Sequence, residues 1–261
     1  MSMISSLQNT LVKQVRRLHR SKGRREENLF LIEGTHLLQT ACESNCSLEI
    51  LCFTEKWRQL YPQLSENGEK ISKRVELVTT EVLGAMATTV NPDGVIAVIA
   101  RGHVHPSIVS PLRLGLVLER IQDPGNLGTI IRTAVATGVD ALWLSGDSVE
   151  IDNPKVLRAS AGEWFRVPIA VREDLSSLIE DYKKEGVRII ATLPTAQKTY
   201  WEIDWTVPSL IVVGNEGGGL SRELVSLCDE GAKIPLANGV ESLNVGIATA
   251  VILYEARRQW G

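Results

Sequence analysis

Residues 112–261 alternate between short apolar runs and stretches of helical character, and this alternation constrains the fold more than any other feature. Several runs are apolar at consecutive positions, so both of their faces must be covered, as in a parallel sheet between two layers of helices. We therefore predict an α/β domain with a parallel sheet. Its strands are expected at residues 112–121, 141–145, 167–171, 187–193, 210–213 and 232–236. Its helices are expected to begin near Gly128, Pro154, Leu175, Leu220 and Leu243.

Residues 1–101 have the pattern of a smaller unit of mixed α/β character. Helices are expected at residues 6–20, 35–43 and 80–87, and strands at residues 28–32, 48–53, 75–78 and 94–100. Residues 102–111 contain one glycine and two prolines, a composition that favours an extended, exposed chain. We therefore predict two domains, residues 1–101 and 112–261, joined by a linker at residues 102–111.

Polar and glycine-rich loops follow three of the predicted strands, at residues 123–134, 214–221 and 237–246. The carboxyl ends of parallel strands meet at one edge of a sheet, where ligands bind. Glycine lets a backbone approach a ligand closely, and helix N-termini offer free N–H groups. None of the loops has the lysine of a P-loop or the G-x-G-x-x-G spacing of a dinucleotide site. A small-molecule dehydrogenase is therefore disfavoured, and each loop taken alone is also compatible with a plain turn between strand and helix.

The distribution of reactive side chains restricts the chemistry further. All four histidines precede Pro111, so the C-terminal half has no imidazole for a Ser-His-Asp hydrolase or a histidine-bound metal. Cys228 lies late in a predicted helix, away from the strand ends, which disfavours a thiolate nucleophile. The polar side chains left at the loops can orient and hydrogen-bond, which suits group transfer from an activated donor. These residues are Asn126, Arg132, Glu216, Ser242 and Asn244.

Three segments resemble, in order and spacing, the signature motifs of the SpoU (TrmH-like) family of SPOUT RNA methyltransferases. They read NLGTIIRTA at 126–134, VGNEGGGLS at 213–221 and IPLANGVESLNV at 234–245. Residues 1–101 resemble the family's ribosomal-protein-like substrate-binding domain through FLIEGTH at 30–36. The resemblance implies a deep trefoil knot, S-adenosylmethionine (AdoMet) as cofactor and ribose 2′-O-methylation as the reaction. One departure is the triple glycine at 217–219, where the family often has a basic or polar residue in the middle.

The resemblance also implies roles for individual residues. The catalytic set would be Arg132, Asn126, Glu216, Ser242 and Asn244, and AdoMet would be bound by Leu193, Gly214, Ile234, Leu236 and Leu243. Arg132 matches the arginine assigned as the base for the ribose hydroxyl. Because a guanidinium is essentially always protonated, two roles stay open: base, or group that orients the hydroxyl and clamps a phosphate. Without this context Arg132 would be a helix-surface arginine and Ser242 a helix N-cap.

A basic run at residues 13–25 contains no acidic residue. Its members are Lys13, Arg16, Arg17, Arg20, Lys22, Arg24 and Arg25. Such runs often form only a solvated helix face, but beside an RNA methyltransferase domain this one predicts phosphate contacts. Residues 1–110 carry 13 Lys and Arg against 11 Asp and Glu, whereas residues 111–261 carry 15 against 20. We therefore expect RNA capture by the N-terminal half, and residues 158–162 (RASAG) also resemble a family segment near the RNA.

The partners follow by the same resemblance. We expect rRNA rather than tRNA as substrate, and a homodimer through the C-terminal domain. No secretion signal follows Met1 and no apolar run approaches about 18 residues, so we expect a cytoplasmic protein without a membrane span. Cys42, Cys46 and Cys52 match no zinc pattern, and no metal is expected. Two alternatives stay open: a SPOUT enzyme that methylates a base, and a catalytically silent RNA-binding factor.

Overall fold

The computed structural model describes residues 3–102, 105–237 and 239–261. Five residues lie outside this description: 1 and 2 of the predicted N-terminal domain, 103 and 104 of the predicted linker, and 238 of the third loop. The chain divides into two compact units. The second unit comprises His105–Val149 and Arg166–Gly261, and the first comprises the residues before it together with Glu150–Phe165. The predicted boundaries at 101 and 112 stay a prediction.

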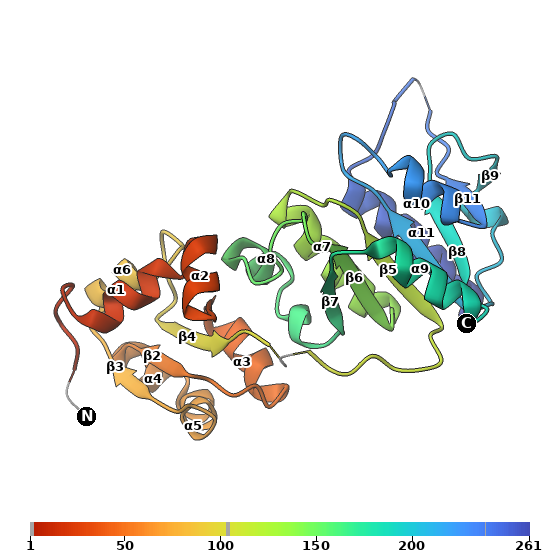
Figure 1. Cartoon of the computed structure of the whole chain (residues 1–261). Helices are drawn as coiled ribbons and strands as arrows, with labels where there is room; N and C mark the ends of the chain where they lie inside the picture. The colour runs from red at the N-terminus through yellow and green to blue at the C-terminus, as the bar shows by residue number, and fades with distance from the viewer. Residues whose placement is uncertain (1–2, 103–104, 238) are drawn as a thin grey trace. The chain divides into compact units, whose positions relative to one another are not determined.

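The second unit is built on a parallel sheet of seven strands, which confirms the predicted α/β class (Figure 1). The strand order is β7-β6-β5-β10-β8-β11-β9. The strands are β5 (Leu114–Leu118), β6 (Ala141–Ser145), β7 (Ile169–Arg172), β8 (Arg188–Thr192), β9 (Lys198–Thr199), β10 (Ser209–Val213) and β11 (Glu230–Lys233). Every residue of β5 and β10 is buried, because helices cover both faces of the sheet at its centre.

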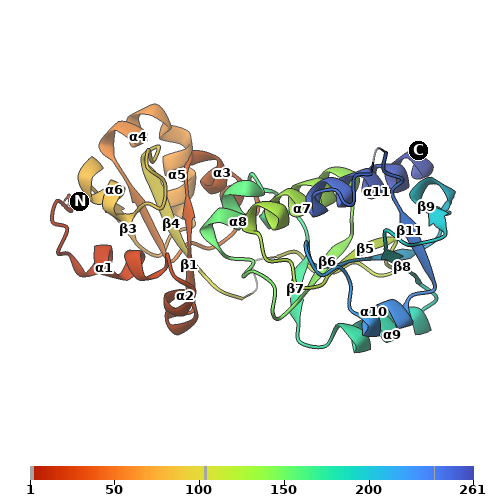
Figure 2. The same cartoon turned by 90° about the horizontal axis from the view of Figure 1, so that it is seen from above.

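Two helices cover each face of this sheet, as Figure 2 shows. On one face lie α7 (Pro124–Thr137) and α11 (Val245–Trp260), and on the other α9 (Leu175–Lys184) and α10 (Arg222–Leu227). Helix α7 has clear sequence signals at both ends. The Asp123 side chain accepts a hydrogen bond from the backbone of Asn126, Pro124 occupies the first turn, and Gly138 ends the helix in a left-handed conformation.

Strand register brings the ends of β5 and β10 level with each other. Val213 pairs with Leu118, and Val212 with Val117, in parallel alignment. The loop that follows β5 therefore lies beside the loop that follows β10. On the other side of β10, β8 separates it from β11, whose Ala232 pairs with Thr192. Loops from β5, β8, β10 and β11 thus meet at the carboxyl edge of one sheet.

The first unit has a four-stranded sheet in the order β1-β4-β2-β3. Strand β4 is antiparallel to both of its neighbours, and β2 and β3 are parallel. Helices α1 and α6 share a hydrophobic core with one face, and α3 and α5 pack against the other. The strands are β1 (Leu29–Glu33), β2 (Ile50–Phe53), β3 (Val75–Leu77) and β4 (Val95–Ala100). The helices are α1 (Thr10–Arg17), α2 (Ser21–Glu27), α3 (Thr35–Glu43), α4 (Glu55–Leu60), α5 (Pro62–Lys70) and α6 (Thr80–Met86).

The segment Glu150–Phe165 belongs to the first unit although it lies between β6 and β7 in sequence. It contains helix α8 (Pro154–Ala159) and a short 3-10 turn, and α8 packs against β1. The rings of Trp164 and Phe30 lie 5.3 Å apart, and the His36 ring nitrogen Nε2 lies 2.8 Å from the carbonyl oxygen of Ala161. The chain therefore leaves the second unit after β6 and returns to it before β7.

The structure differs from the expected elements in three places. The helix expected at residues 6–20 is shorter, because the chain turns after Arg17 and begins the separate helix α2 inside the basic run. Helices α4 and α5 were not expected, because residues 55–70 are mostly polar and only Trp57 is deeply buried among the apolar residues there. The two-residue edge strand β9 was also missed. No helix in the described ranges combines the length and the apolar character that a membrane crossing needs.

Candidate cofactor and catalytic site

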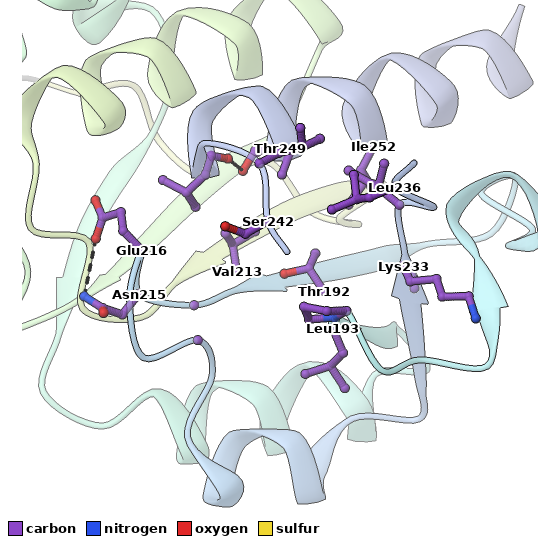
Figure 3. A pocket seen from close by; sticks show the side chains of 18 of the residues that line it. Thr192, Leu193, Val213, Asn215, Glu216, Lys233, Leu236, Ser242, Thr249 and Ile252 are labelled. Carbon is purple, nitrogen blue, oxygen red and sulfur yellow. Dashed lines mark hydrogen bonds between the residues drawn. The ribbon is translucent and has the colours of Figure 1, made fainter. Parts of the chain in front are cut away.

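A cavity of 370 Å³ opens at the carboxyl edge of the second unit's sheet, between helix α11 and the loops that follow β8, β10 and β11 (Figure 3). All five residues that the resemblance assigns to the cofactor line it: Leu193, Gly214, Ile234, Leu236 and Leu243. Glu216 and Ser242 of the predicted catalytic set line it too. Its volume falls in the range of about 300–1,000 Å³ that is usual for small-molecule sites.

The lining of this cavity suits a ligand with an apolar ring and a positive charge. Val213, Leu236 and Ile252 supply apolar surface, the carboxylates of Glu216 and Glu241 supply negative charge, and Lys233 adds one positive charge. Gly214 gives the chain a close approach that no other residue allows. A Cβ atom there would lie 2.3 Å from the backbone carbon of Gly219. AdoMet, with an adenine ring and a sulfonium, fits this donor set.

Three residues of the predicted catalytic set form one hydrogen-bonded chain. The Asn244 side-chain amide donates to the Asn126 side-chain oxygen at 2.8 Å, and the Asn126 amide donates to the Glu216 carboxylate at 3.1 Å. Asn244 also caps helix α11, since its side-chain oxygen accepts from the backbone N–H groups of Gly246 and Ile247. The N-termini of α7 and α11 are therefore tied to the loop after β10.

Glu216 is held as a charged acceptor. Besides Asn126, the backbone N–H groups of Gln122 and Asp123 donate to its carboxylate, at 3.3 Å and 3.2 Å. Partial burial pushes the pKa of the Glu216 carboxyl up, but these hydrogen bonds together outweigh that effect and hold the pKa below its ordinary value. At neutral pH the carboxylate is ionised and accepts hydrogen bonds only.

Arg132 and Ser242 are placed differently from this chain of contacts. Arg132 lies six residues beyond Asn126 on α7, a rise of about 9 Å along the helix axis. Its side chain is exposed, and within residues 3–102, 105–237 and 239–261 it forms no hydrogen bond or ion pair. Ser242 is exposed at the cavity and is not a helix N-cap, because Asn244 takes that position. One copy of the chain therefore joins Asn126 and Asn244, which do not line the cavity, to Glu216, which does, and leaves Arg132 apart from these contacts.

The cysteine thiols are held in their protonated form. Burial, assisted by Asp229, raises the pKa of Cys228 to about 12, and burial raises the pKa of Cys52 to about 12 as well. Burial raises the pKa values of Cys42 and Cys46 to about 11. A thiol must lose its proton to act as a nucleophile or a metal ligand, so these four are unreactive at neutral pH.

One residue of the basic run, Arg24, is buried and therefore not accessible to RNA. Arg24 is only 2% exposed, its Nε donates to Asp152 at 3.1 Å, and its guanidinium also pairs with Glu150. Asp152 in turn pairs with Arg101 at 2.5 Å. Assigning Arg24 to the RNA-binding set was therefore wrong, because the residue is a buried ion-pair partner of the segment Glu150–Phe165.

The other six basic residues are exposed: Lys13, Arg16, Arg17, Arg20, Lys22 and Arg25. All but Arg25 line a hollow of 510 Å³ between α1 and α2. Gly23 brings these helices together, since a Cβ atom there would lie 2.1 Å from the carbonyl oxygen of Arg17. Acidic partners hold Arg17, Lys22 and Arg25. In the described part of the chain, Lys13, Arg16 and Arg20 have no such partner.

The sequence analysis missed Asn215, which lines the cavity beside Glu216. Its side-chain oxygen accepts from the backbone N–H groups of Gly217 and Gly218, at 3.0 Å and 2.8 Å. An asparagine before a run of glycines is a common turn signal, and this signal was available. The contact that its amide makes with the loop after β5 could not be seen in the sequence.

The fold and the site together define a class of protein: a parallel-sheet enzyme that binds a small activated donor at the carboxyl ends of its strands. A sequence profile of the SpoU rRNA Methylase family matches residues 113–254, and one of the MRM3-like substrate binding domain matches residues 9–97. The chain belongs to the SpoU rRNA Methylase family.

Named relatives match over nearly the full length of the chain. A tRNA/rRNA methyltransferase of Synechocystis, itself uncharacterized, is 48% identical over 98% of this chain and 93% of its own length. The 23S rRNA (guanosine(2553)-2′-O)-methyltransferase RlmP of Bacillus subtilis is 34% identical over 98% of this chain and 100% of its own. Among solved structures, an AdoMet-bound rRNA methyltransferase from Sinorhizobium meliloti superposes with a TM-score of 0.85 at 31% identity, covering 98% of this chain and 97% of that one.

Proposed function

We propose that the protein transfers a methyl group from AdoMet to the 2′-hydroxyl of a ribose in RNA, with rRNA as the favoured substrate. The observation that carries this proposal is the hydrogen-bonded chain from Asn244 through Asn126 to Glu216, at a cavity that fits AdoMet. Relatives named for ribose 2′-O-methylation of 23S rRNA support the choice of acceptor and of RNA. The ribosomes of a bacterium are cytoplasmic, so we place the protein there.

We assign the roles as follows. Leu193, Gly214, Ile234, Leu236 and Leu243 hold the cofactor, which supplies an activated methyl group on its sulfonium when bound. Glu216 fixes Asn126, Asn244 is bonded to Asn126 at the N-terminus of α11, and Ser242 completes the lining of the cavity. Arg132 orients the ribose hydroxyl and the adjacent phosphate. We also propose that the loops around this cavity are threaded as the deep trefoil knot, and that domain 1–101 captures the RNA for domain 112–261.

We propose a homodimer through the face of α7 and α11, because this face has features that a second copy would explain. Helices α7 and α11 pack against each other on one side of the sheet. On α11, Ile247 is 51% exposed and Tyr254 is 56% exposed, at positions two turns apart. The unpartnered Arg132 lies on α7 in the same layer. A second copy placed here would cover the apolar side chains and complete a site that one copy leaves without an arginine.

The reaction can be tested directly with AdoMet carrying a tritiated methyl group. We expect label to enter rRNA and, after digestion, to be recovered in 2′-O-methylated nucleosides. Label recovered in a methylated base would instead establish the base-modifying alternative. RNA that stays unlabelled while it binds the protein would establish the catalytically silent RNA-binding factor.

RNA capture should depend on Lys13, Arg16 and Arg20, the exposed cations of the basic run that have no acidic partner in the described part of the chain. In the triple variant Lys13→Gln, Arg16→Gln, Arg20→Gln we expect weaker RNA binding with unchanged AdoMet binding. If each cation neutralises one phosphate, the slope of log affinity against log salt should fall by about 2–3. Filter binding of RNA across a salt series measures this slope.

The matched control removes three positive charges elsewhere on the same unit, at Lys56, Lys70 and Lys73, each replaced by glutamine. Lys70 pairs with Glu66 and Lys73 with Glu49, whereas Lys56 is exposed and has no ion pair in the described ranges. We expect this control to retain most of the salt slope. Equal losses in both triple variants would mean that only net charge matters, and would refute a phosphate-binding hollow between α1 and α2.

A further inference from the structure

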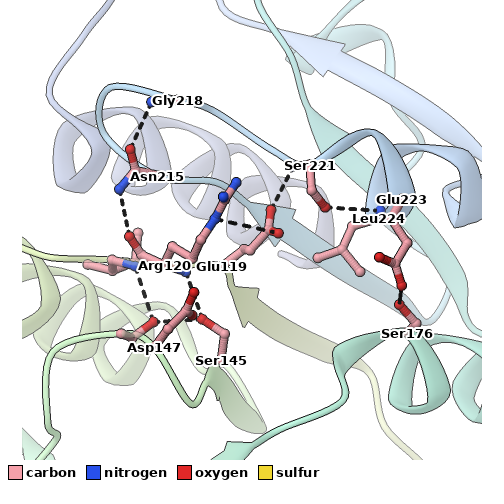
Figure 4. A network of polar contacts seen from close by, with 12 residues as sticks. Glu119, Arg120, Ser145, Asp147, Ser176, Asn215, Gly218, Ser221, Glu223 and Leu224 are labelled. Carbon is pink, nitrogen blue, oxygen red and sulfur yellow. Dashed lines mark hydrogen bonds and ion pairs between the residues drawn. The ribbon is translucent and has the colours of Figure 1, made fainter.

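The loop that follows β5 contains a residue in an unfavourable backbone conformation. Arg120 has a φ of 54°, in the left-handed region that is unfavourable for a residue with a side chain. Two hydrogen bonds stabilise it there (Figure 4). Its backbone N–H donates to the Ser145 hydroxyl at 2.8 Å, and its carbonyl oxygen accepts from the Asn215 side-chain amide at 2.7 Å. The left-handed backbone at Arg120 therefore places its carbonyl oxygen where the Asn215 side-chain amide donates a hydrogen bond to it.

The side chain of Asn215 uses both of its ends. Its amide group donates to the carbonyl oxygen of Arg120 and, at 3.3 Å, to the Glu216 carboxylate (Figure 3). Its oxygen closes the glycine turn by accepting from Gly217 and Gly218. The backbone of Asn215 also pairs with that of Gly219 in both directions, at 3.1 Å and 3.0 Å. Asn215 thus fixes the glycine turn within itself and attaches it to the loop after β5, in addition to the hydrogen bonds that the Glu216 carboxylate accepts from Gln122 and Asp123 of that loop.

The buried carboxylate of Glu119 makes a further attachment between the loop after β5 and the loop after β10. Glu119 is 8% exposed, and its side chain accepts from the backbone N–H of Ser221 at 2.8 Å. Its own backbone N–H donates to the carbonyl oxygen of Val213 at 2.9 Å. The segment 214–221 is therefore held near both ends, and Glu216 lies between the two attachments.

We propose that Asn215, anchored on the carbonyl oxygen of Arg120, is a positioning residue that holds the Glu216 carboxylate beside Asn126. The proposal rests on the proposed function, because it gives Glu216 its role at the cavity. The three glycines that follow Glu216 have large conformational freedom, and the contacts of Asn215 limit the positions that the backbone carrying the carboxylate can take. A misplacement of about 1 Å in a catalytic group can lower a rate about 100-fold.

The guanidinium of Arg120 is not the anchoring group in this proposal. It is 41% exposed, and its Nε lies 3.7 Å from the Glu119 carboxylate. The backbone carbonyl makes the contact, so the backbone conformation of residue 120 should matter more than its side chain. Glycine adopts a left-handed conformation readily, whereas a β-branched valine resists it. Glycine and valine substitutions at this position therefore separate the contribution of the backbone conformation of residue 120 from that of its side chain.

The experiment compares Arg120→Gly, Arg120→Val and Asn215→Ala in the full chain, by steady-state methyl transfer at saturating RNA and AdoMet and by calorimetric titration with AdoMet. We expect Asn215→Ala and Arg120→Val to lower kcat about 10- to 100-fold, and to change the Kd for AdoMet by much less. Arg120→Gly should keep at least about tenfold more kcat than Arg120→Val. Backbone amide exchange at Gly217 and Gly218 should speed up in Asn215→Ala, since that variant removes their acceptor.

Asn45→Val is the matched control for strain, because Asn45 is also left-handed, with a φ of 51°, and lies exposed in the first unit. It should cost stability as Arg120→Val does but leave kcat within about twofold. Equal kcat in Arg120→Gly and Arg120→Val, or an Asn215→Ala variant as active as the control, would overturn the anchoring role. Glu216→Gln separates this failure from that of the proposed function: if it keeps full activity, the role of Glu216 itself is wrong.

Discussion

Replacing Arg132 with alanine is expected to lower kcat for RNA methylation about 10²- to 10⁴-fold and to leave AdoMet affinity within about twofold. The side chain is exposed, has no partner in the described part of the chain and does not line the cofactor cavity. Its loss therefore leaves the cofactor site and the fold intact. Steady-state methyl transfer at saturating RNA and AdoMet measures the first quantity, and calorimetric titration with AdoMet measures the second.

The control for Arg132 is Arg222→Ala, an exposed arginine at the start of α10 that lies outside the predicted site and has no ion pair in the described ranges. We expect this variant to methylate RNA at the wild-type rate. Should Arg132→Ala behave in the same way, Arg132 is a helix-surface arginine and the catalytic assignment fails.

Arg132→Lys distinguishes between the two roles that the sequence left open for Arg132. If the guanidinium only orients the hydroxyl and the phosphate, a lysine keeps the charge but loses the planar pair of donors, and the rate falls by a similar factor at every pH. If the residue takes the hydroxyl proton, the lysine variant becomes active as its amine loses a proton, near a pKa of about 10.4. We expect the first result, because an orienting role needs no neutral guanidinium.

A methyl group added at Gly214 is expected to weaken AdoMet binding at least about 100-fold. In Gly214→Ala the new Cβ atom would lie 2.3 Å from the backbone carbon of Gly219 and 2.4 Å from the backbone nitrogen of Leu220. Neither backbone atom can yield as a flexible side chain would. The strand end and the glycine turn must move apart, and both of them line the cavity. Calorimetry on the purified variant measures the loss, and a thermal melt checks that the protein is folded.

Gly218→Ala is the matched control in the same turn. A Cβ atom at Gly218 would meet only the side-chain oxygen of Asn215, at 3.5 Å, which is an ordinary contact distance. We expect AdoMet affinity within about threefold of the wild type. A large loss in this variant as well would show that the whole turn tolerates no side chain, and that the close approach at Gly214 is not special.

Sequence reasoning found most of the second unit because its signals are local. Consecutive apolar residues mark buried parallel strands, and Asp123 before Pro124 marks the start of a helix. The order of the strands in the sheet could not be predicted in this way, because β10 lies between β5 and β8 through pairing between residues that are far apart in the chain. The mostly polar helices α4 and α5 were not predicted, because they bury few apolar side chains and show little hydrophobic periodicity.

The residues of the candidate site could be predicted where they belong to a sequence motif. They could not be predicted where tertiary packing decides whether a side chain is exposed. Resemblance placed Asn126, Glu216 and Asn244 together, and the structure joins them by hydrogen bonds. Arg24 stands in a run of exposed cations, and nothing in that run distinguishes it from its neighbours. Its burial depends on Asp152, which lies 128 residues further along the chain, so no local pattern could reveal it. A charged run indicates exposure only on average.

The excursion of Glu150–Phe165 into the first unit has a consequence for the order in which the protein is made. Synthesis proceeds from the N-terminus, and early domains usually fold as they emerge. Here the first unit would have to wait, because Arg24 has a buried charge whose partners Glu150 and Asp152 come from later in the chain. An unpaired buried charge costs several kcal/mol. The nascent N-terminal unit therefore stays incomplete until β5 and β6 of the second unit have been synthesised, which links the completion of the first unit to the synthesis of the second.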